Sequence, residues 1–186
     1  MISISAASVA YLLAFTIIVW LSRKPLRHPG SHGFYRFFAW QGILCLFAFH
    51  HPFWAANSLN PQSLLSTVLM VSSIGLVLAG WLELKRKGKA STDREDEALY
   101  DFEKTTSLVS SGIFRHIRHP MYASLLLLAW GAFWQRPTDP GILVVSITTI
   151  SLFLTARADE RECLVHFGST YARYKEKTWA FLPWIY

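Results

Sequence analysis

A group of polar side chains lies directly in front of an apolar stretch in the second half of the chain. Arg118 and His119 precede Pro120, and Tyr122 follows within one helical turn. A proline in the first turn of a helix sets the direction in which the chain enters that helix. Ionisable side chains at the start of a membrane helix are candidates for function. We therefore expect these side chains at the mouth of a helix bundle; Arg115 nearby fits equally well as an interfacial anchor.

A second group of polar side chains follows the last apolar stretch. Arg157 and Glu160 are three residues apart and share one helical face with Leu164. Phe167 and Gly168 predict the end of this helix, with the glycine as its cap. Arg157 and Glu160 could bind a ligand together, or they could form an ordinary ion pair between neighbouring turns. The residues alone leave both possibilities open.

Five apolar segments predict the elements that must position these side chains. They cover residues 2–21, 37–56, 63–82, 121–134 and 141–156. A membrane-spanning helix needs about 20 mostly apolar residues, and the chain is 52% hydrophobic but only 16% charged. We predict an all-α, polytopic membrane bundle of about five transmembrane helices. The first segment should remain in the mature protein, because no basic residues precede it and no cleavage pattern follows it.

The basic residues predict the orientation of this bundle. All 18 Lys and Arg residues except Arg136 fall in alternate loops or just after the fifth segment. Basic loops stay on the cytoplasmic side of a membrane. The amino terminus should therefore lie outside and the carboxy terminus in the cytoplasm. The net charge of +6 then reflects topology, and we expect no nucleic-acid partner.

Three histidine pairs raise the possibility of a metal centre. The pairs are His28 with His32, His50 with His51, and His116 with His119. Imidazole is a common ligand for transition metals. The predicted topology places the second pair on the opposite side of the membrane from the other two. We therefore expect no metal site.

The two polar regions together resemble a known family. The stretch SGIFRHIRHPMYAS, followed by DERECLVHFGSTYARY and a terminal FLP, is similar to the isoprenylcysteine carboxyl methyltransferases and related small membrane methyltransferases. The resemblance covers the chain from residue 111 onward. It implies S-adenosylmethionine as the methyl donor, bound at the cytoplasmic face without a Rossmann domain. The chain indeed has no Gly-x-Gly-x-x-Gly sequence.

The resemblance also implies where the donor binds. Arg118 and His119 would donate hydrogen bonds to its carboxylate, and Glu160 would accept one from its ammonium group. Phe114 and Tyr122 would lie against its adenine or sulfonium. Gly112, which has no side chain, would let the backbone approach the adenosine. The predicted cofactor pocket is thus formed by the last loop and the C-terminal helix.

For catalysis, the resemblance implies that Glu160 takes part and that an arginine on its helix orients the methyl acceptor. Arg157 is the nearest match and Arg161 the second. The chain departs from the family pattern at several positions: Asp159 replaces a glutamate, Ile113 and Phe114 replace Pro-Tyr, Ser124 replaces a glycine, and Trp179 replaces a proline. Because of these departures, the resemblance does not identify the methyl acceptor.

We divide the predicted single domain, residues 1–186, into four parts. Residues 1–84 hold three spans, 85–120 form a cytoplasmic connection, 121–156 form a helical hairpin, and 157–186 form the catalytic segment. The expected acceptor is lipophilic or lipidated and reaches the site from the membrane lipid; a prenylcysteine carboxylate, a lipid amine and a thiol are all possible. The alternative is an NADPH-dependent reductase, because membrane sterol and steroid reductases have a similar C-terminal block.

Overall fold

The computed structural model describes residues 6–50, 60–88 and 107–182, and helices dominate these ranges. The α-helices are α1 (Ala6–Leu21), α2 (His32–His50), α3 (Pro61–Lys87), α4 (Pro120–Gln135), α5 (Asp139–Phe167) and α6 (Ser169–Lys175). Two short 3-10 helices, η1 (Pro25–Arg27) and η3 (Gly112–Arg115), lie in the connections. Within the described ranges the backbone forms no β-strand, so the predicted all-α class is confirmed.

The ends of the two longest helices follow from local sequence. The side chain of Asn60 accepts a hydrogen bond from the backbone of Ser63 at 2.7 Å, which caps the start of α3. Thr138 caps α5 in the same way through the backbone of Gly141 at 3.1 Å. Helix α5 ends at Phe167, and Gly168 follows with a φ of 55°. The predicted glycine cap is therefore confirmed.

The helices pack through small residues and expose large apolar ones. The hydroxyl of Ser66 on α3 donates to the carbonyl of Gly131 on α4 at 2.6 Å, and a Cβ on Gly131 would lie 2.6 Å from the Met70 side chain. Between α2 and α5, a Cβ on Gly42 would overlap Thr148. The outer faces instead carry exposed large hydrophobic residues, among them Leu64, Val68, Val71, Ile74, Leu143, Ile147 and Ile150. Small residues at contacts and apolar residues outside are typical of helices in membranes.

Two helices are long and apolar enough to cross a membrane, α3 and α5. Helix α1 is apolar but shorter. The predicted segment 37–56 lies partly on α2 and partly outside the described residues, and segment 121–134 lies on α4, which has 16 residues. The structure thus supports membrane helices, and the number of five spans stays a prediction.

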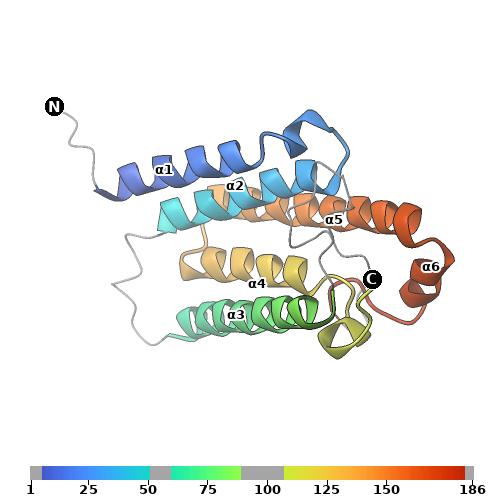
Figure 1. Ribbon diagram of the computed structural model, residues 1–186. Helices are drawn as coiled ribbons and strands as arrows, with labels where there is room; N and C mark the ends of the chain where they lie inside the picture. The colour runs from blue at the N-terminus through green and yellow to red at the C-terminus, as the bar shows by residue number, and fades with distance from the viewer. Residues whose placement is uncertain (1–5, 51–59, 89–106, 183–186) are drawn as a thin grey trace.

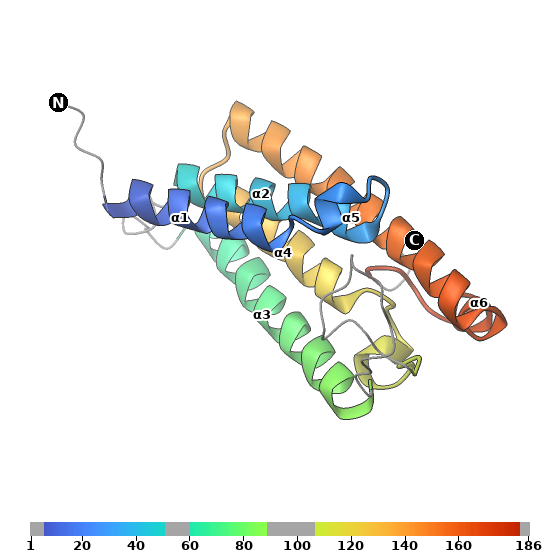
Figure 2. The same ribbon diagram turned by 45° about the horizontal axis from the view of Figure 1, so that its top comes forward.

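The helices alternate in direction, so that one end of the bundle collects the polar segments. Figure 1 shows the C-terminal ends of α1, α3 and α5 beside the N-terminal ends of α2 and α4, and Figure 2 shows the same arrangement from a second angle. Helix α6 and η3 lie at this end as well. The functional residues predicted from the two polar regions therefore come from elements that meet in space.

The boundaries of the four predicted parts of the chain do not coincide with the ends of the helices. Helix α3 continues to Lys87, past the boundary at residue 84, and α5 crosses residue 157 without a break. The hairpin and the predicted C-terminal segment therefore share one continuous helix of 29 residues. Part of the connection 85–120, including its acidic stretch, lies outside the described residues.

Candidate active site

The segment after α6 is attached to the residues that precede α4. The backbone of Trp179 donates to the carbonyl of His116 at 3.0 Å, and the backbones of Arg118 and His119 donate to Trp179 and Ala180 at 2.7 and 3.0 Å. These bonds form a short parallel bridge between two parts of the chain that are far apart in sequence. They hold the Arg118–His119 pair in a fixed position.

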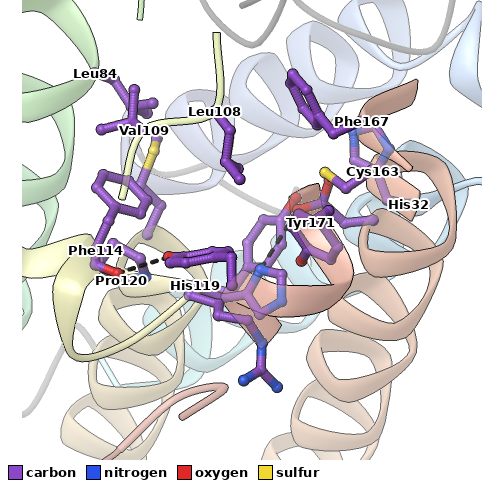
Figure 3. A pocket seen from close by; sticks show the side chains of 15 residues that line it. His32, Leu84, Leu108, Val109, Phe114, His119, Pro120, Cys163, Phe167 and Tyr171 are labelled. Carbon is purple, nitrogen blue, oxygen red and sulfur yellow. Dashed lines mark hydrogen bonds and ion pairs between the residues drawn. The ribbon is translucent and has the colours of Figure 1, made fainter. Parts of the chain in front are cut away.

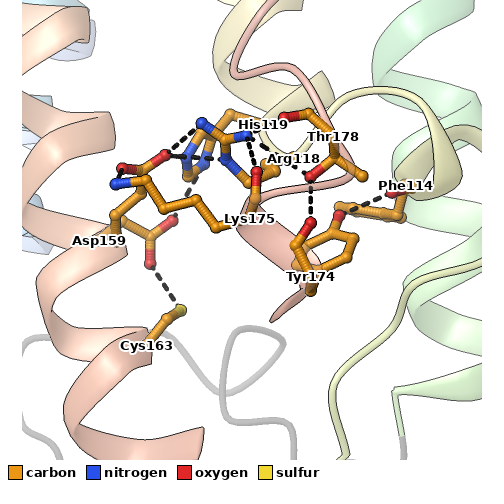
Figure 4. A network of polar contacts seen from close by, with 9 residues as sticks. Phe114, Arg118, His119, Asp159, Cys163, Tyr174, Lys175 and Thr178 are labelled. Carbon is orange, nitrogen blue, oxygen red and sulfur yellow. Dashed lines mark hydrogen bonds and ion pairs between the residues drawn. The ribbon is translucent and has the colours of Figure 1, made fainter. Parts of the chain in front are cut away.

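The side chain of Arg118 strengthens this attachment. Its Nε and Nη2 atoms each lie 2.9 Å from Oε1 of Glu160 on α5. Its Nη1 donates to the carbonyls of Lys175, at 3.1 Å, and Thr178. The side chain is only 5% exposed, and Figure 4 shows it at the centre of the polar network. Arg118 thus ties α5 to the chain after α6.

Glu160 is the carboxylate on which this network converges. Besides Arg118, it contacts Nζ of Lys175 at 2.6 Å and Nε2 of His119 at 3.4 Å. Its side chain is 4% exposed. A buried carboxylate needs such partners, because its charge has been removed from water.

His119 lies between two neighbouring carboxylates of α5. Its Nδ1 is 3.4 Å from Asp159 and its Nε2 is 3.4 Å from Glu160. Burial lowers the pKa of His119, but the bonds to both carboxylates outweigh burial and raise that pKa above its ordinary value. The imidazole also stacks on Tyr122, with ring centroids 5.4 Å apart. The arrangement favours a fixed imidazolium cation.

A cavity of about 140 Å³, the first cavity, opens beside His119 and Tyr122. Figure 3 shows its lining side chains. One end is apolar and is lined by Leu84, Leu108, Val109 and Phe114. The other end is more polar and is lined by His32, Asp159, Cys163 and Tyr171. The cavity therefore offers different surroundings to the two ends of an elongated ligand.

Two tyrosines of α6 close the first cavity. The hydroxyl of Tyr174 donates to the carbonyl of Phe114 at 2.7 Å, and Tyr171 is 3% exposed. The two rings make an edge contact with each other. Burial raises the pKa of both phenols, so both stay neutral at physiological pH. Helix α6 thus adds aromatic surface to the cavity.

A second cavity of about 450 Å³ lies along another part of α5. Arg157, Glu160 and Arg161 of α5 line it, together with Tyr35 of α2 and Lys175 of α6. Arg157 and Arg161 are exposed, whereas Glu160 is buried. Three basic side chains, those of Arg157, Arg161 and Lys175, therefore line this second cavity.

The structure brings together most of the residues predicted to bind a cofactor. Phe114, Arg118, His119 and Tyr122 all line the first cavity, whereas Glu160 and Arg157 line the second. Gly112 lines neither: it packs against Glu83 of α3. Its φ is 57°, and a Cβ there would lie 2.7 Å from the Glu83 carboxyl carbon. Gly112 therefore satisfies a backbone and packing requirement next to α3.

The sequence alone does not identify several residues of the first cavity. Asp159 stands out in the sequence only as a departure from the family pattern, although it contacts His119. Tyr171 and Tyr174, one turn apart, carried a recognisable spacing without an assigned role. The spacing of His32 from His28 raises only the possibility of a metal, and no local pattern links His32 to its partner Glu162, 130 positions away in the chain.

His50 and His32 lie at opposite ends of α2. Nδ1 of His50 donates to the carbonyl of Ala132 at 2.8 Å, and His51 lies outside the described residues. Among the residues described, no three His, Cys, Asp or Glu side chains gather as metal ligands.

Comparison with known proteins identifies the family. The sequence model of the phospholipid methyltransferases matches residues 61–169, more than half of the 186-residue chain. The chain belongs to the phospholipid methyltransferase family. The predicted resemblance to small membrane methyltransferases is thereby confirmed. In this family member, the matched range includes Phe114, His119, Tyr122 and Asp159 of the first cavity and ends just before the two tyrosines of α6.

A curated relative is also similar. Methanethiol S-methyltransferase 1 of Bradyrhizobium diazoefficiens is 31% identical over 74 residues, which are 39% of this chain and 25% of the relative. The chain therefore spans about a quarter of that relative's length. No solved structure matches the chain.

Proposed function

We propose that the protein transfers a methyl group from S-adenosylmethionine to a lipophilic acceptor at the cytoplasmic face of a membrane. The observation that carries this proposal is the convergence of both polar sequence regions on the first cavity. Phe114, His119 and Tyr122 come from one region, and Asp159 and Tyr171 come from the other. Family membership supports the methyltransferase over the NADPH-dependent reductase.

The side chains of the first cavity fit the chemistry of the donor. Sulfonium and ammonium groups are cations, which favour aromatic faces and carboxylates. Phe114, Tyr122 and Tyr171 supply aromatic rings for the adenine and sulfonium, and Asp159 supplies a carboxylate for the ammonium. The imidazolium of His119 would attract the donor carboxylate. When bound, the donor would supply an activated methyl group.

Arg118 and Glu160 would act indirectly, by holding the residues that contact the donor in place. Arg118 lines the first cavity, yet its guanidinium donates to Glu160 and to two carbonyls. Glu160 contacts His119 from the side of the second cavity. We infer that this ion pair keeps His119 and the C-terminal segment in the geometry that binding requires.

The acceptor would be oriented from the second cavity. Arg157 lines this cavity together with the apolar side chains of Leu154 and Leu164. An apolar wall beside a cation suits a lipophilic molecule with a polar or anionic head. Methyl transfer needs mainly the alignment of acceptor and donor and the exclusion of water. We therefore assign Arg157 to the orientation of the acceptor, with Arg161 next to it.

Calorimetry with the detergent-purified protein tests the proposal. We expect binding of S-adenosylmethionine and of its demethylated product, and no binding of NADPH. His119→Ala should weaken donor binding by about tenfold or more, because it removes the imidazolium that would attract the donor carboxylate, and a loss of about 1.4 kcal/mol corresponds to tenfold. Arg157→Ala serves as the matched variant and should lower turnover more than donor affinity. Binding of NADPH without any response to the methyl donor would overturn the proposal.

A further inference from the structure

A polar cluster at the end of α3 joins this helix to the segment that precedes α4. The hydroxyl of Ser111 donates to Oε1 of Glu83 at 2.6 Å. Nζ of Lys87, one turn after Glu83, donates to the Ser111 hydroxyl at 2.8 Å and lies 3.0 Å from the same Glu83 oxygen. These three side chains, which we call the Glu83 cluster, therefore form a closed ring of contacts.

A further contact joins the same segment to the last residue of α3. Ser107 donates through its hydroxyl to the backbone carbonyl of Lys87 at 3.1 Å. The last carbonyls of a helix have no donor within the helix, so other groups can bond to them. Ser107 and Ser111 are thus both attached to the last turn of α3, and they are the two ends of segment 107–111.

The residues within and just after this segment line the apolar end of the first cavity. Leu108 and Val109 lie between the two serines, and Phe114 follows in η3. Val109 and Phe114 are buried. Leu84 lines the same end of the cavity from α3 (Figure 3). Leu108, Val109 and Phe114 therefore form one wall of the cavity, the apolar wall, which is fastened to α3 from behind by polar contacts.

We propose that Glu83 and Ser111 are positioning residues for the methyl donor, because they hold the apolar wall in the place that donor binding requires. The structure describes both residues, and neither lines the first cavity, so they act through the wall. This inference rests on the methyltransferase function proposed above and extends the donor site to the end of α3.

The two ends of the cavity indicate which part of the donor the apolar wall contacts. Asp159 at the polar end suits the donor ammonium, and His119 suits its carboxylate. The adenine, a flat aromatic ring, is then left for the apolar end. Contacts between atoms weaken steeply with distance, and a gap of about 0.5–1 Å already removes about a quarter to a half of their attraction. A small displacement of the wall should therefore weaken donor binding.

Gly112 fits the same arrangement. Its φ is 57°, and a Cβ there would lie 2.7 Å from the carboxyl carbon of Glu83. Glycine adopts this backbone conformation without a steric penalty. The backbone next to Ser111 can therefore turn directly against the carboxylate, and the missing side chain of Gly112 makes room for Glu83.

The exposure of the Glu83 cluster separates its role from general stabilisation. The Lys87 side chain is 56% exposed and the Glu83 side chain 14%, and exposed ion pairs contribute little to global stability. The wall has another support, since the Tyr174 hydroxyl donates to the carbonyl of Phe114. Loss of the cluster should therefore loosen the wall without unfolding the bundle, so that donor affinity changes more than Tm.

Calorimetry on the full chain in detergent tests the inference, with S-adenosylmethionine and its demethylated product as ligands. Glu83→Ala and Ser111→Ala should each weaken the binding of both ligands by about tenfold, because each removes a hydrogen bond to a charged group. The double variant should lose no more than either single variant, since both changes remove the same bond. The Tm values should stay close to that of the wild type.

Conservative variants and a neighbouring serine provide the controls. Glu83→Gln keeps an acceptor and Ser111→Thr keeps a hydroxyl, so both should retain most of the donor affinity. Ser110→Ala changes an exposed serine that lines neither described cavity and should bind the donor like the wild type. Lys87→Gln changes an exposed side chain with little risk to folding and should weaken donor binding by about threefold, because one member of the ring is lost.

Hydrogen exchange locates the change in the chain. In ligand-free Ser111→Ala, the backbone amides of residues 107–114 should exchange faster than in the wild type, whereas those in the middle of α3 and α4 should not. The unchanged helices would show that the variant loosens the wall alone.

The outcomes separate this inference from the function on which it rests. A wild-type protein that does not bind the methyl donor would overturn the proposed function and the positioning role together. Normal donor binding by the wild type and by Ser111→Ala would overturn the positioning role alone. If Ser111→Ala does not fold, wild-type affinity in Lys87→Gln has the same meaning. A lower Tm with unchanged donor affinity would show that the cluster only stabilises the bundle.

Discussion

Arg118 and Glu160 combine several structural contacts in one buried ion pair. The guanidinium bonds to α5 and to the chain after α6, and the carboxylate also contacts Lys175 and His119. The ion pair thus contacts residues from both of the polar regions that form the first cavity. A change in either residue should affect stability as well as ligand binding.

At the residue scale, we predict that Glu160→Gln destabilises the protein. The change leaves the Arg118 guanidinium, whose side chain is 5% exposed, without its carboxylate. Removing one partner of a buried ion pair costs about 3–5 kcal/mol. Thermal unfolding in detergent should show a clearly lower Tm.

A matched control for this prediction is Lys87→Gln. It removes the ion pair between Lys87 and Glu83, in which the Lys87 side chain is 56% exposed. Exposed ion pairs contribute little to stability, so the Tm should hardly change. Equal Tm values for the two variants would show that Glu160 is dispensable for folding and would favour a direct contact with the ligand.

At the element scale, the contact between α3 and α4 depends on the absence of a side chain. A Cβ at Gly131 would lie 2.6 Å from Met70 Cγ and 3.2 Å from the Ser66 carbonyl oxygen. Gly131→Ala should therefore push the helices apart and cost about 1–3 kcal/mol, as overpacking of a tight contact does. Thermal stability in detergent measures the effect.

Gly75→Ala on the partner helix α3 is the control for Gly131→Ala on α4. Nothing lies within 4 Å of a Cβ at this position, and alanine favours helix more than glycine does. Its Tm should equal or slightly exceed that of the wild type. A Gly131→Ala variant as stable as Gly75→Ala would contradict the close packing of α3 and α4.

At the scale of the whole molecule, the alternating helices predict the sidedness of the loops. The loop before α2 and the loop between α4 and α5 lie at opposite ends of the bundle (Figure 1). Three helices separate these loops along the chain. If each crosses the membrane, the loops must lie on opposite sides, with the basic end in the cytoplasm.

Cysteine labelling checks this topology after replacement of Cys45 and Cys163 by alanine. A membrane-impermeant maleimide should label Pro137→Cys in intact cells and Pro29→Cys only after permeabilisation. Both positions are exposed, so burial does not limit the reaction. Labelling of both from the same side would rule out the predicted orientation and the five-span bundle.

The sequence by itself determined the helices and much of the cavity wall. Apolar segments predict helices because burial in lipid depends on composition along a continuous stretch. Segments 63–82 and 141–156 lie within α3 and α5, but both helices extend further, since backbone hydrogen bonding continues after the apolar pattern ends. Phe114, His119 and Tyr122 were identified because their motif is contiguous.

Only the tertiary structure decided how the distant side chains pair. Glu160 engages Arg118, Asp159 faces His119, and His32 meets Glu162 across 130 positions of the chain. Such pairs depend on how α2, α4 and α5 turn about their own axes and meet at one end of the bundle. The spacing of residues along the sequence carries no information about that rotation. The rotation is set by close contacts between helices, such as the one between Gly42 of α2 and Thr148 of α5.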